Sequence, residues 1–336
     1  DKESFQSGFM EGSNLLFRGM CDPYRTPVHE FNPEGLYPEE TAVIGDKHAT
    51  ELFVDAGVKY IREYDSDQPF FLYMAFTAPH DPRIVPPEYS AMYDPADIPL
   101  PKNFMPVHPF DNGEMFVRDE SLAKLPRDPY EITRQISEYY AMITHMDAQI
   151  GRVLKALEDK GIADDTIVVY TADHGISIGQ HGLIGKQSMY DHSIRIPFII
   201  RGPNVPAGKR LNQLTCQMDI FPTLCQLVGL PIPETVDGKG LLPLMKGETD
   251  EGYDSVFAIY KDVQRMVKSG EWKLIRYYRS KERNCGSNML QLFNVREDPW
   301  EIHNLALCPE YRGKVDELLG KLREWQIRLN DPLLTI

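Results

Sequence analysis

Two short apolar runs, at residues 69–76 and 166–171, constrain the fold of this chain more than any other feature of its sequence. Each run is too short for a core helix and stops at a polar loop, which is typical of a strand buried on both faces. Between them, residues 129–160 carry apolar side chains at helical spacing, and Gly161 follows where a helix would end. A helix is also expected at about residues 46–64. This alternation predicts an α/β fold with a doubly wound, mostly parallel sheet.

The pattern changes after residue 246. Downstream, short strand-like runs joined by turns replace the alternation, and an amphipathic helix is expected at about residues 309–329. We therefore predict an α/β domain at residues 1–246 and a small α+β domain at residues 247–336. The remaining elements are expected at residues 196–201 (strand), 219–228 (helix), and 255–260, 263–267, 273–278 and 290–293 (antiparallel sheet).

Composition narrows the class of protein. The net charge is −14 and no Lys/Arg cluster stands out, which argues against a nucleic-acid partner. No apolar run approaches the roughly 20 residues of a membrane helix, so no membrane partner is expected. The five cysteines contain no Cys-x-x-Cys pair, which argues against a zinc knuckle and a disulfide framework. No signal peptide is visible, and the absence of Asn-x-Ser/Thr favours a bacterial origin, with a periplasmic or other extracytoplasmic location expected.

Asp173 and His174 directly follow the second apolar run, and Gly175 comes next. A carboxylate and an imidazole on adjacent residues can bind one ion where the backbone turns sharply, and glycine allows such a turn. In doubly wound sheets, ligand groups gather at the carboxyl ends of the strands. We therefore interpret Asp173 and His174 as metal ligands. The alternative is an aspartate that caps its own turn beside an ordinary histidine.

Two further residues could contact an anionic substrate. Lys186 lies in a glycine-rich loop after Asp173 and could present its charge to an anionic oxygen. His80 follows the first apolar run between two prolines and could bind an anion or act as an acid. Arg83 and His181 lie beside the expected crevice, where they could bind a sugar or a carboxylate. Each of the four could instead be solvated or serve its own loop.

Several stretches, in the same order over nearly the whole chain, resemble type I sulfatases of the alkaline phosphatase superfamily. The resemblance implies an alkaline-phosphatase-like α/β fold and a metal-dependent hydrolase that cleaves a sulfate ester, with a carbohydrate sulfate as the expected substrate. The stretches are residues 69–82, 138–152, 166–175, 185–197, 219–223 and 298–305.

The resemblance also implies a role for each candidate residue. Asp173 and His174 correspond to ligands of a divalent metal, which in the family is usually calcium. Lys186 corresponds to the lysine that contacts the sulfate ester, and His80 to the histidine that binds the sulfate or assists the leaving oxygen. A phosphodiesterase or phosphonate hydrolase of the same superfamily is the alternative enzyme. A relative that binds an anion or carbohydrate without catalysis is the alternative of another class.

The family also uses a nucleophile in Cys/Ser-x-Pro-x-Arg and an Asp-Asp pair on an earlier strand. Cys21-Asp-Pro-Tyr-Arg25 matches the first pattern in its letters. However, Pro27 and Pro33 oppose the helix that the family cysteine opens, and no Asp-Asp strand precedes it. We therefore expect the match to be a coincidence and the nucleophile-bearing region to lie upstream. The chain alone is then expected to have little or no sulfatase activity.

Overall fold

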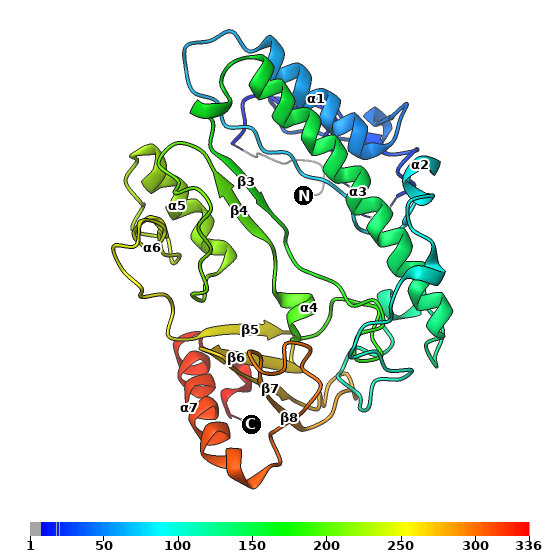
Figure 1. Ribbon diagram of the computed structural model, residues 1–336, viewed down its shortest axis with the longest axis vertical. Coiled ribbons are helices and arrows are strands. Elements are labelled where there is room, and N and C mark those ends of the chain that lie inside the picture. Colours follow the sequence, from blue (N-terminus) through cyan, green and yellow to red (C-terminus); the bar gives the residue numbers. More distant parts are fainter. Residues whose placement is uncertain (1–7, 18, 20, 336) are drawn as a thin grey trace. The chain divides into compact units, whose positions relative to one another are not determined.

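The computed structural model describes residues 8–17, 19 and 21–335 (Figure 1). The chain divides into two compact units. Unit 1 comprises Asp1–Pro99 and Thr133–Thr166, and unit 2 comprises Leu100–Ile132 and Ile167–Ile336. Each unit is described by itself. The predicted domain boundary after residue 246 stays a prediction.

Unit 1 is built on two long helices, α1 (Ala49–Glu63) and α3 (Pro129–Asp159), which confirm the helical predictions. They lie side by side (Figure 1), and Asp55 of α1 accepts a hydrogen bond from Arg152 of α3 at 2.5 Å. The first residues of α3 belong to unit 2. The shorter elements are β1 (Pro27–Val28) paired with β2 (Val43–Ile44), α2 (Pro87–Ser90), and 3-10 helices at Glu39–Thr41, Pro95–Asp97 and Ala163–Asp165.

The predicted strand at residues 69–76 is wrong for the structure as described. Exposure alternates along the segment, with Phe71 and Tyr73 exposed and Met74 packed closely against Gly57 of α1. The segment is therefore covered on one side only. A strand needs a neighbour that supplies hydrogen bonds, and none of the described strands pairs with it.

The predicted strands at residues 166–171 and 196–201 are confirmed in unit 2 as β3 (Val168–Thr171) and β4 (Phe198–Arg201). They pair antiparallel, with Val168 opposite Arg201. β3 is only half-buried, because β4 is the element it packs against. Every strand pair within the described residues is antiparallel, so the parallel part of the predicted sheet does not form there. The accompanying helices are α4 (Asp191–Ile194), α5 (Ile220–Val228) and α6 (Leu242–Lys246), with 3-10 helices at Asp119–Leu122 and Gln217–Asp219.

The C-terminal part of unit 2 matches its prediction closely. Four strands form an antiparallel sheet in sequence order, and α7 (Arg312–Arg328) lies against it (Figure 1). Leu318 and Leu322 of α7 pack with Val267, Leu274 and Leu292 of the sheet in one buried cluster. The strands are β5 (Val256–Tyr260), β6 (Gln264–Ser269), β7 (Trp272–Tyr277) and β8 (Met289–Asn294), and 3-10 helices occupy Pro309–Tyr311 and Pro332–Thr335.

The five cysteines are all unpaired. Across the described part of the chain, no helix has both the length and the apolar character needed to span a membrane.

Candidate active site

Asp173 and His174 lie at the carboxyl end of β3, where the sequence predicts them. The Asp173 carboxylate faces solvent, with 82% of its side chain exposed, and the imidazole of His174 is partly exposed. Oδ1 of Asp173 accepts the backbone N–H of His174 at 2.8 Å, and Oδ2 lies 3.4 Å from Nε2 of His174. The two side chains therefore turn toward the same side of the strand end.

The imidazole of His174 is oriented by its own backbone. Nδ1 lies 2.8 Å from the carbonyl oxygen of Gly175 and donates to it, and Nε2 faces Oδ2 of Asp173. Metal-binding histidines commonly donate their other ring N–H to a backbone carbonyl in this way. Donor atoms 3.4 Å apart can share one ion at 2.0–2.6 Å from each, so the pair fits part of a divalent-metal site.

Gly175 is required by a close approach to α4. A Cβ atom on this residue would lie 2.1 Å from the carbonyl oxygen of His192, and its N–H donates to Ser193 at 2.7 Å. Only glycine allows the turn after His174 to lie so near the α4 backbone. The sequence-based expectation of glycine at this turn therefore has a specific steric reason.

Within the described residues, no third metal-ligating side chain joins Asp173 and His174. No group of three His, Cys, Asp or Glu side chains there could hold an ion. Calcium usually takes six to eight oxygen ligands. Asp173 and His174 thus supply at most a fraction of such a coordination shell.

The loop that carries Lys186 is held by a buried carboxylate. Glu120 accepts hydrogen bonds from the backbone N–H groups of Ile184 at 3.1 Å and Gly185 at 3.0 Å. It also forms a short ion pair with Arg127, whose side chain is fully buried and whose Nε donates to Gly182 at 3.0 Å. Because a buried charge must be paired and hydrogen-bonded, this arrangement fixes the backbone on the N-terminal side of Lys186.

The ammonium group of Lys186 lies 3.8 Å from Oδ2 of Asp119, and the side chain is partly exposed. Gln187 links the two residues, since its Oε1 accepts from the backbone of Lys186 and its Nε2 donates to Asp119. Burial raises the pKa of Asp119, but the hydrogen bond from Gln187 and the charge of Lys186 outweigh it and hold this pKa below its usual range. Asp119 is therefore ionised at neutral pH.

His181 is engaged inside its own loop. The side chain is buried, its ring stacks on Tyr190 with centroids 3.8 Å apart, and Nε2 accepts from Asn103 at 3.1 Å. Its backbone oxygen accepts from Nδ1 of His108 at 2.7 Å. Burial, aided by the nearby His108, lowers the pKa of His181 to about 4, so the ring is neutral at pH 7. These contacts favour the alternative in which His181 serves the loop rather than a substrate.

His80 and Arg83 belong to unit 1. Nδ1 of His80 lies 2.8 Å from the backbone oxygen of Asp81, and its side chain is partly exposed. Arg83 donates through Nη1 to Gln135 of α3 at 2.7 Å, and its buried Nε and Nη2 have no hydrogen-bond partner among the described residues. Burial lowers the pKa of Arg83. Buried N–H donors without partners are costly, so Arg83 is suited to donate hydrogen bonds to an acceptor group of a ligand.

Asp173, His174, His181 and Lys186 belong to unit 2. Within that unit, one stretch of chain carries all four residues, between β3 and β4. That His80 and Asp173 share one crevice stays a prediction, because it concerns both units. Sequence reasoning missed Asp119, Glu120 and Arg127, which lie in a Pro-rich segment without periodicity and so gave no local signal.

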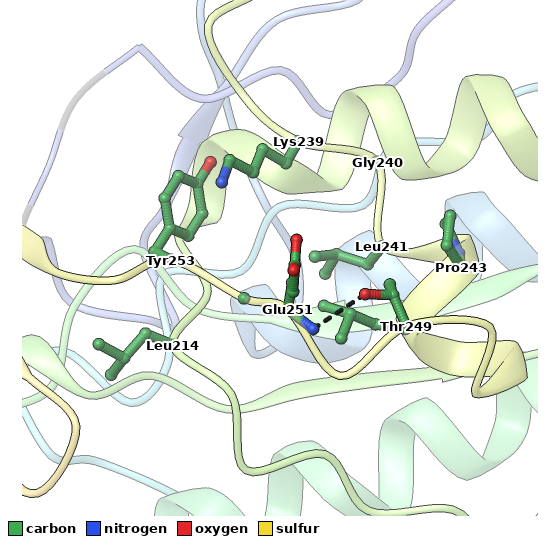
Figure 2. Close-up of a pocket in the computed structure, with 10 residues that line it drawn as sticks. Leu214, Lys239, Gly240, Leu241, Pro243, Thr249, Glu251 and Tyr253 are labelled. Atoms are coloured by element: carbon green, nitrogen blue, oxygen red, sulfur yellow. Dashed lines mark hydrogen bonds between the residues drawn. The ribbon is translucent and has the colours of Figure 1, made fainter.

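A small cavity lies elsewhere in unit 2 and contains none of the predicted site residues. It measures about 80 Å³ and lies between Leu214, residues 239–244 and residues 249–253. Figure 2 shows the amine of Lys239 beside the ring of Tyr253, 4.3 Å from its centroid, and the carboxylate of Glu251 near Leu241. The volume is close to that of a few water molecules, so the cavity is too small for a substrate.

Cys21-Asp-Pro-Tyr-Arg25 forms a turn rather than the start of a helix. Oδ1 of Asp22 accepts the backbone N–H of Tyr24, and the backbone of Arg25 donates back to Asp22. That the match to the sulfatase nucleophile pattern is a coincidence stays a prediction.

The described elements form an α/β protein with a candidate site after β3, and comparison with known proteins gives its family. Residues 4–230 match the Sulfatase family, and residues 179–328 match the C-terminal region of N-sulphoglucosamine sulphohydrolase. The chain therefore belongs to the sulfatase family.

Two curated relatives agree with this family assignment. The chain is 30% identical to an arylsulfatase of Clostridium perfringens, over 81% of this chain and 56% of that protein. It is 27% identical to the multifunctional alkaline phosphatase superfamily protein PehA of Trinickia caryophylli, over 92% of this chain and 65% of that protein. The chain thus spans about half to two thirds of the length of these curated relatives.

Two solved structures confirm the fold class. One is a protein in complex with its substrate D-glucosamine-2-N,6-O-disulfate, with a TM-score of 0.79 and 22% identity over 98% of this chain and 78% of that chain. The other is a phosphonate monoester hydrolase of Agrobacterium radiobacter, with a TM-score of 0.68 and 24% identity over 83% of this chain and 60% of that chain. At these identities the likeness establishes the fold alone.

Proposed function

We propose that this chain is the metal- and substrate-binding portion of a sulfatase that hydrolyses a sulfate ester of a carbohydrate. The observation that carries the proposal is the solvent-facing pair of Asp173 and His174, whose Oδ2 and Nε2 atoms lie 3.4 Å apart at the end of β3. Membership of the sulfatase family supports it, as does the similarity to a protein solved with a sulfated glucosamine.

Each candidate residue has a role in this proposal. Asp173 and His174 bind a divalent cation, expected to be calcium, and this cation when bound polarises the sulfate ester. Lys186 stabilises negative charge on the transferring group, and His80 does so on the leaving oxygen. Arg83 supplies donors to an acidic or hydroxyl group of the substrate. His181 holds the loop between β3 and Lys186 in place.

Metal binding tests the first step without relying on activity. Titration of the 336-residue chain with Ca²⁺, followed by calorimetry, is expected to give weak binding that falls more than tenfold in Asp173→Ala. Asp237→Ala removes another exposed carboxylate and is the matched control. Equal Ca²⁺ affinity in all three proteins would contradict the proposed metal site.

Catalysis tests the second step. The chain alone is expected to turn over an aryl sulfate little or not at all, because it carries only part of a metal site. Robust turnover by the purified chain would instead direct attention to Cys21. The coding sequence upstream of Asp1 separates an enzyme from a non-catalytic binder. An Asp-Asp strand followed by Cys/Ser-x-Pro-x-Arg there supports the enzyme, and the lack of both supports the binder.

A second enzymatic activity is kept because one structural neighbour is a phosphonate monoester hydrolase. Sulfuryl and phosphoryl esters place similar charge on similar oxygens, so the same residues could serve either. Parallel assays of the complete protein with an aryl sulfate and an aryl phosphodiester discriminate the two. Faster hydrolysis of the phosphodiester would overturn the sulfatase proposal in favour of this alternative.

A further inference from the structure

His48 is buried in unit 1 and directly precedes helix α1, where it caps the first turn. Residues at this position are normally Ser, Thr, Asp or Asn, whose short side chains accept a backbone N–H of that turn. In His48 the imidazole does so, since Nδ1 accepts the backbone N–H of Thr50 at 3.2 Å. An accepting Nδ1 carries no proton, so the proton of the neutral ring lies on Nε2.

The other nitrogen of the same ring reaches the loop that carries His80 and Arg83. Nε2 of His48 donates to the backbone oxygen of Ile84 at 3.0 Å. Ile84 directly follows Arg83, whose side chain donates to Gln135 of α3. The end of this loop is therefore bonded to the start of α1 and to α3. One imidazole makes the first of these connections and uses both of its nitrogen atoms in doing so.

The orientation of the His48 ring is fixed by two rings that pack against it. Tyr24 contacts it edge to face with centroids 5.2 Å apart, and His145 of α3 does the same at 4.5 Å. His145 is itself buried, and its Nε2 lies 3.2 Å from Oε1 of Glu51. A ring packed in this way has little freedom to turn, so both of its hydrogen bonds keep their direction.

The protonation state of His48 agrees with these contacts. Burial lowers its pKa, and this effect outweighs the hydrogen bond to Ile84, which alone would raise the pKa. The ring is therefore neutral at pH 7, as its contact with Thr50 requires. A second proton, on Nδ1, would point at the N–H of Thr50 and leave two donors facing each other.

We propose that His48 is a positioning residue, which sets the place of the loop carrying His80 and Arg83 by joining Ile84 to the start of α1. The inference rests on the proposed function, in which His80 and Arg83 contact the substrate. A group that assists a leaving oxygen needs a defined position, because a displacement of about 1 Å can cost on the order of a hundredfold in rate. His48 contributes through Ile84 and does not itself touch the substrate.

Two variants separate the two nitrogen atoms of the ring. His48→Asn puts an amide oxygen near the place of Nδ1, so it keeps the cap, but it is too short to reach Ile84. His48→Gln puts an amide nitrogen near the place of Nε2, so it can keep the bond to Ile84, but it is a poor cap. A merely structural ring would not divide its effects in this way.

Hydrogen exchange of the 336-residue chain at pH 7, read by mass spectrometry, measures the difference. Amides between residues 80 and 85 are expected to exchange about threefold to tenfold faster in His48→Asn, which corresponds to the loss of one hydrogen bond, and near the wild-type rate in His48→Gln. Amides of the first turn of α1 are expected to show the reverse. His29→Asn alters another buried histidine of unit 1, bonded to Thr41, and is the matched control.

Three results would overturn the inference. The first is wild-type exchange between residues 80 and 85 in His48→Asn. The second is equal acceleration there in His48→Asn and His48→Gln, which would indicate lost packing. The third needs no variant, because nitrogen NMR of the wild-type imidazoles would show the proton of His48 on Nδ1 instead of Nε2.

Activity separates this inference from the function on which it rests. In the complete protein, His48→Asn is expected to lower kcat for an aryl sulfate more than His48→Gln does, with a smaller change in KM. Equal kcat in the two variants contradicts a positioning role in catalysis. Turnover that His80→Ala leaves unchanged contradicts the proposed role of His80, whatever the exchange of the loop shows.

Discussion

Two ionic groups of unit 2 lie close together and differ in how their charges are compensated. Lys273 is fully buried, and its ammonium group lies 2.6 Å from Oδ1 of Asp191 and 2.5 Å from Oε1 of Glu301. Asp173 and His174 face solvent, 3.4 Å apart, and no other acidic, histidine or cysteine side chain completes their group in the described residues. The charges of the first group are paired with one another inside the protein. The second group faces solvent and can still bind a ligand.

The difference distinguishes a charge group that stabilises the fold from one that could bind a metal ion. A buried ion is tolerated only where its partners replace water, so Lys273 and its carboxylates contribute to the fold as a unit. An exposed carboxylate beside an imidazole can exchange water for a metal at little cost to stability. The two groups are joined through α4, because Asp191 begins this helix and Gly175 donates to its Ser193. The buried group thus holds the backbone against which the exposed pair is positioned.

The largest expected effect comes from breaking the buried group. Lys273→Ala leaves the buried carboxylate of Glu301 without its cation and leaves Asp191 with Lys268 alone, 3.4 Å away, and is expected to lower the free energy of unfolding by about 3–5 kcal/mol. Urea unfolding followed by circular dichroism measures the change. Arg296→Ala breaks the exposed pair with Glu271, 3.6 Å apart, and is the control, with an expected loss below about 1 kcal/mol. Similar losses in the two variants would remove the basis of the comparison.

Gly175→Ala tests the link between the two groups. The new Cβ atom would lie 2.1 Å from the His192 backbone oxygen, so the turn must move away from α4. We expect a loss of about 1–3 kcal/mol in unfolding free energy, together with weaker Ca²⁺ binding, because His174 is displaced. Gly320→Ala on α7 meets no atom within 4 Å and is expected to stabilise the protein by up to about 1 kcal/mol. An unchanged Ca²⁺ affinity in Gly175→Ala would show that the turn does not position the metal ligands.

A third charge group, Asp331 with Arg265, is expected to make the stability of the protein depend on pH. Both side chains are buried, and the carboxylate oxygens lie 2.6 and 2.7 Å from the guanidinium. Burial raises the pKa of Asp331, but the hydrogen bonds from Arg265 and Gln326 outweigh it and lower this pKa to about 2. Because the folded-state pKa lies below the unfolded one, the contribution is complete above about pH 4 and is lost as the pH falls toward 2.

Comparison with Asp331→Asn measures this dependence. The difference in urea midpoint between wild type and variant is expected to be constant from pH 7 to 5 and to shrink between pH 4 and 2. A difference that stays constant down to pH 2 would contradict the lowered pKa of Asp331.

The smallest expected effect on stability belongs to the exposed pair. Asp173→Ala removes a solvent-facing carboxylate whose hydrogen bond is to its own neighbour, so unfolding free energy should change by no more than about 0.5 kcal/mol. Its Ca²⁺ affinity should nevertheless fall more than tenfold. A loss of stability comparable to that of Lys273→Ala would mean that Asp173 supports the fold, and would weaken the functional interpretation.

The parts of the fold that sequence predicted well are those specified by local pattern. The strands β5–β8 and helix α7 bury their alternating or helical apolar positions within a short stretch of chain, so periodicity is sufficient to find them. The segment at residues 69–76 has the same apolar content, yet it forms no strand in the described structure. Strand formation there requires a partner that periodicity cannot specify.

The candidate site also contains residues that local sequence could reveal and residues that it could not. Asp173, His174 and Gly175 were recognisable because they are adjacent in sequence and follow a strand. Glu120 and Arg127 were not, since they reach the Lys186 loop from more than fifty residues away along the chain. The buried state of His181 was equally unreadable, because it depends on Asn103, His108 and Tyr190 arriving from other segments.

By itself the sequence indicated the family by resemblance, predicted most of the longer helices and strands, and located a carboxylate and an imidazole at the end of β3. These follow from local periodicity, short motifs and their spacing. Only the tertiary structure decided which charges are buried and paired, and which donors of Arg83 are left without partners among the described residues. Burial and pairing depend on contacts between distant residues, and such contacts leave no pattern in any one stretch of chain.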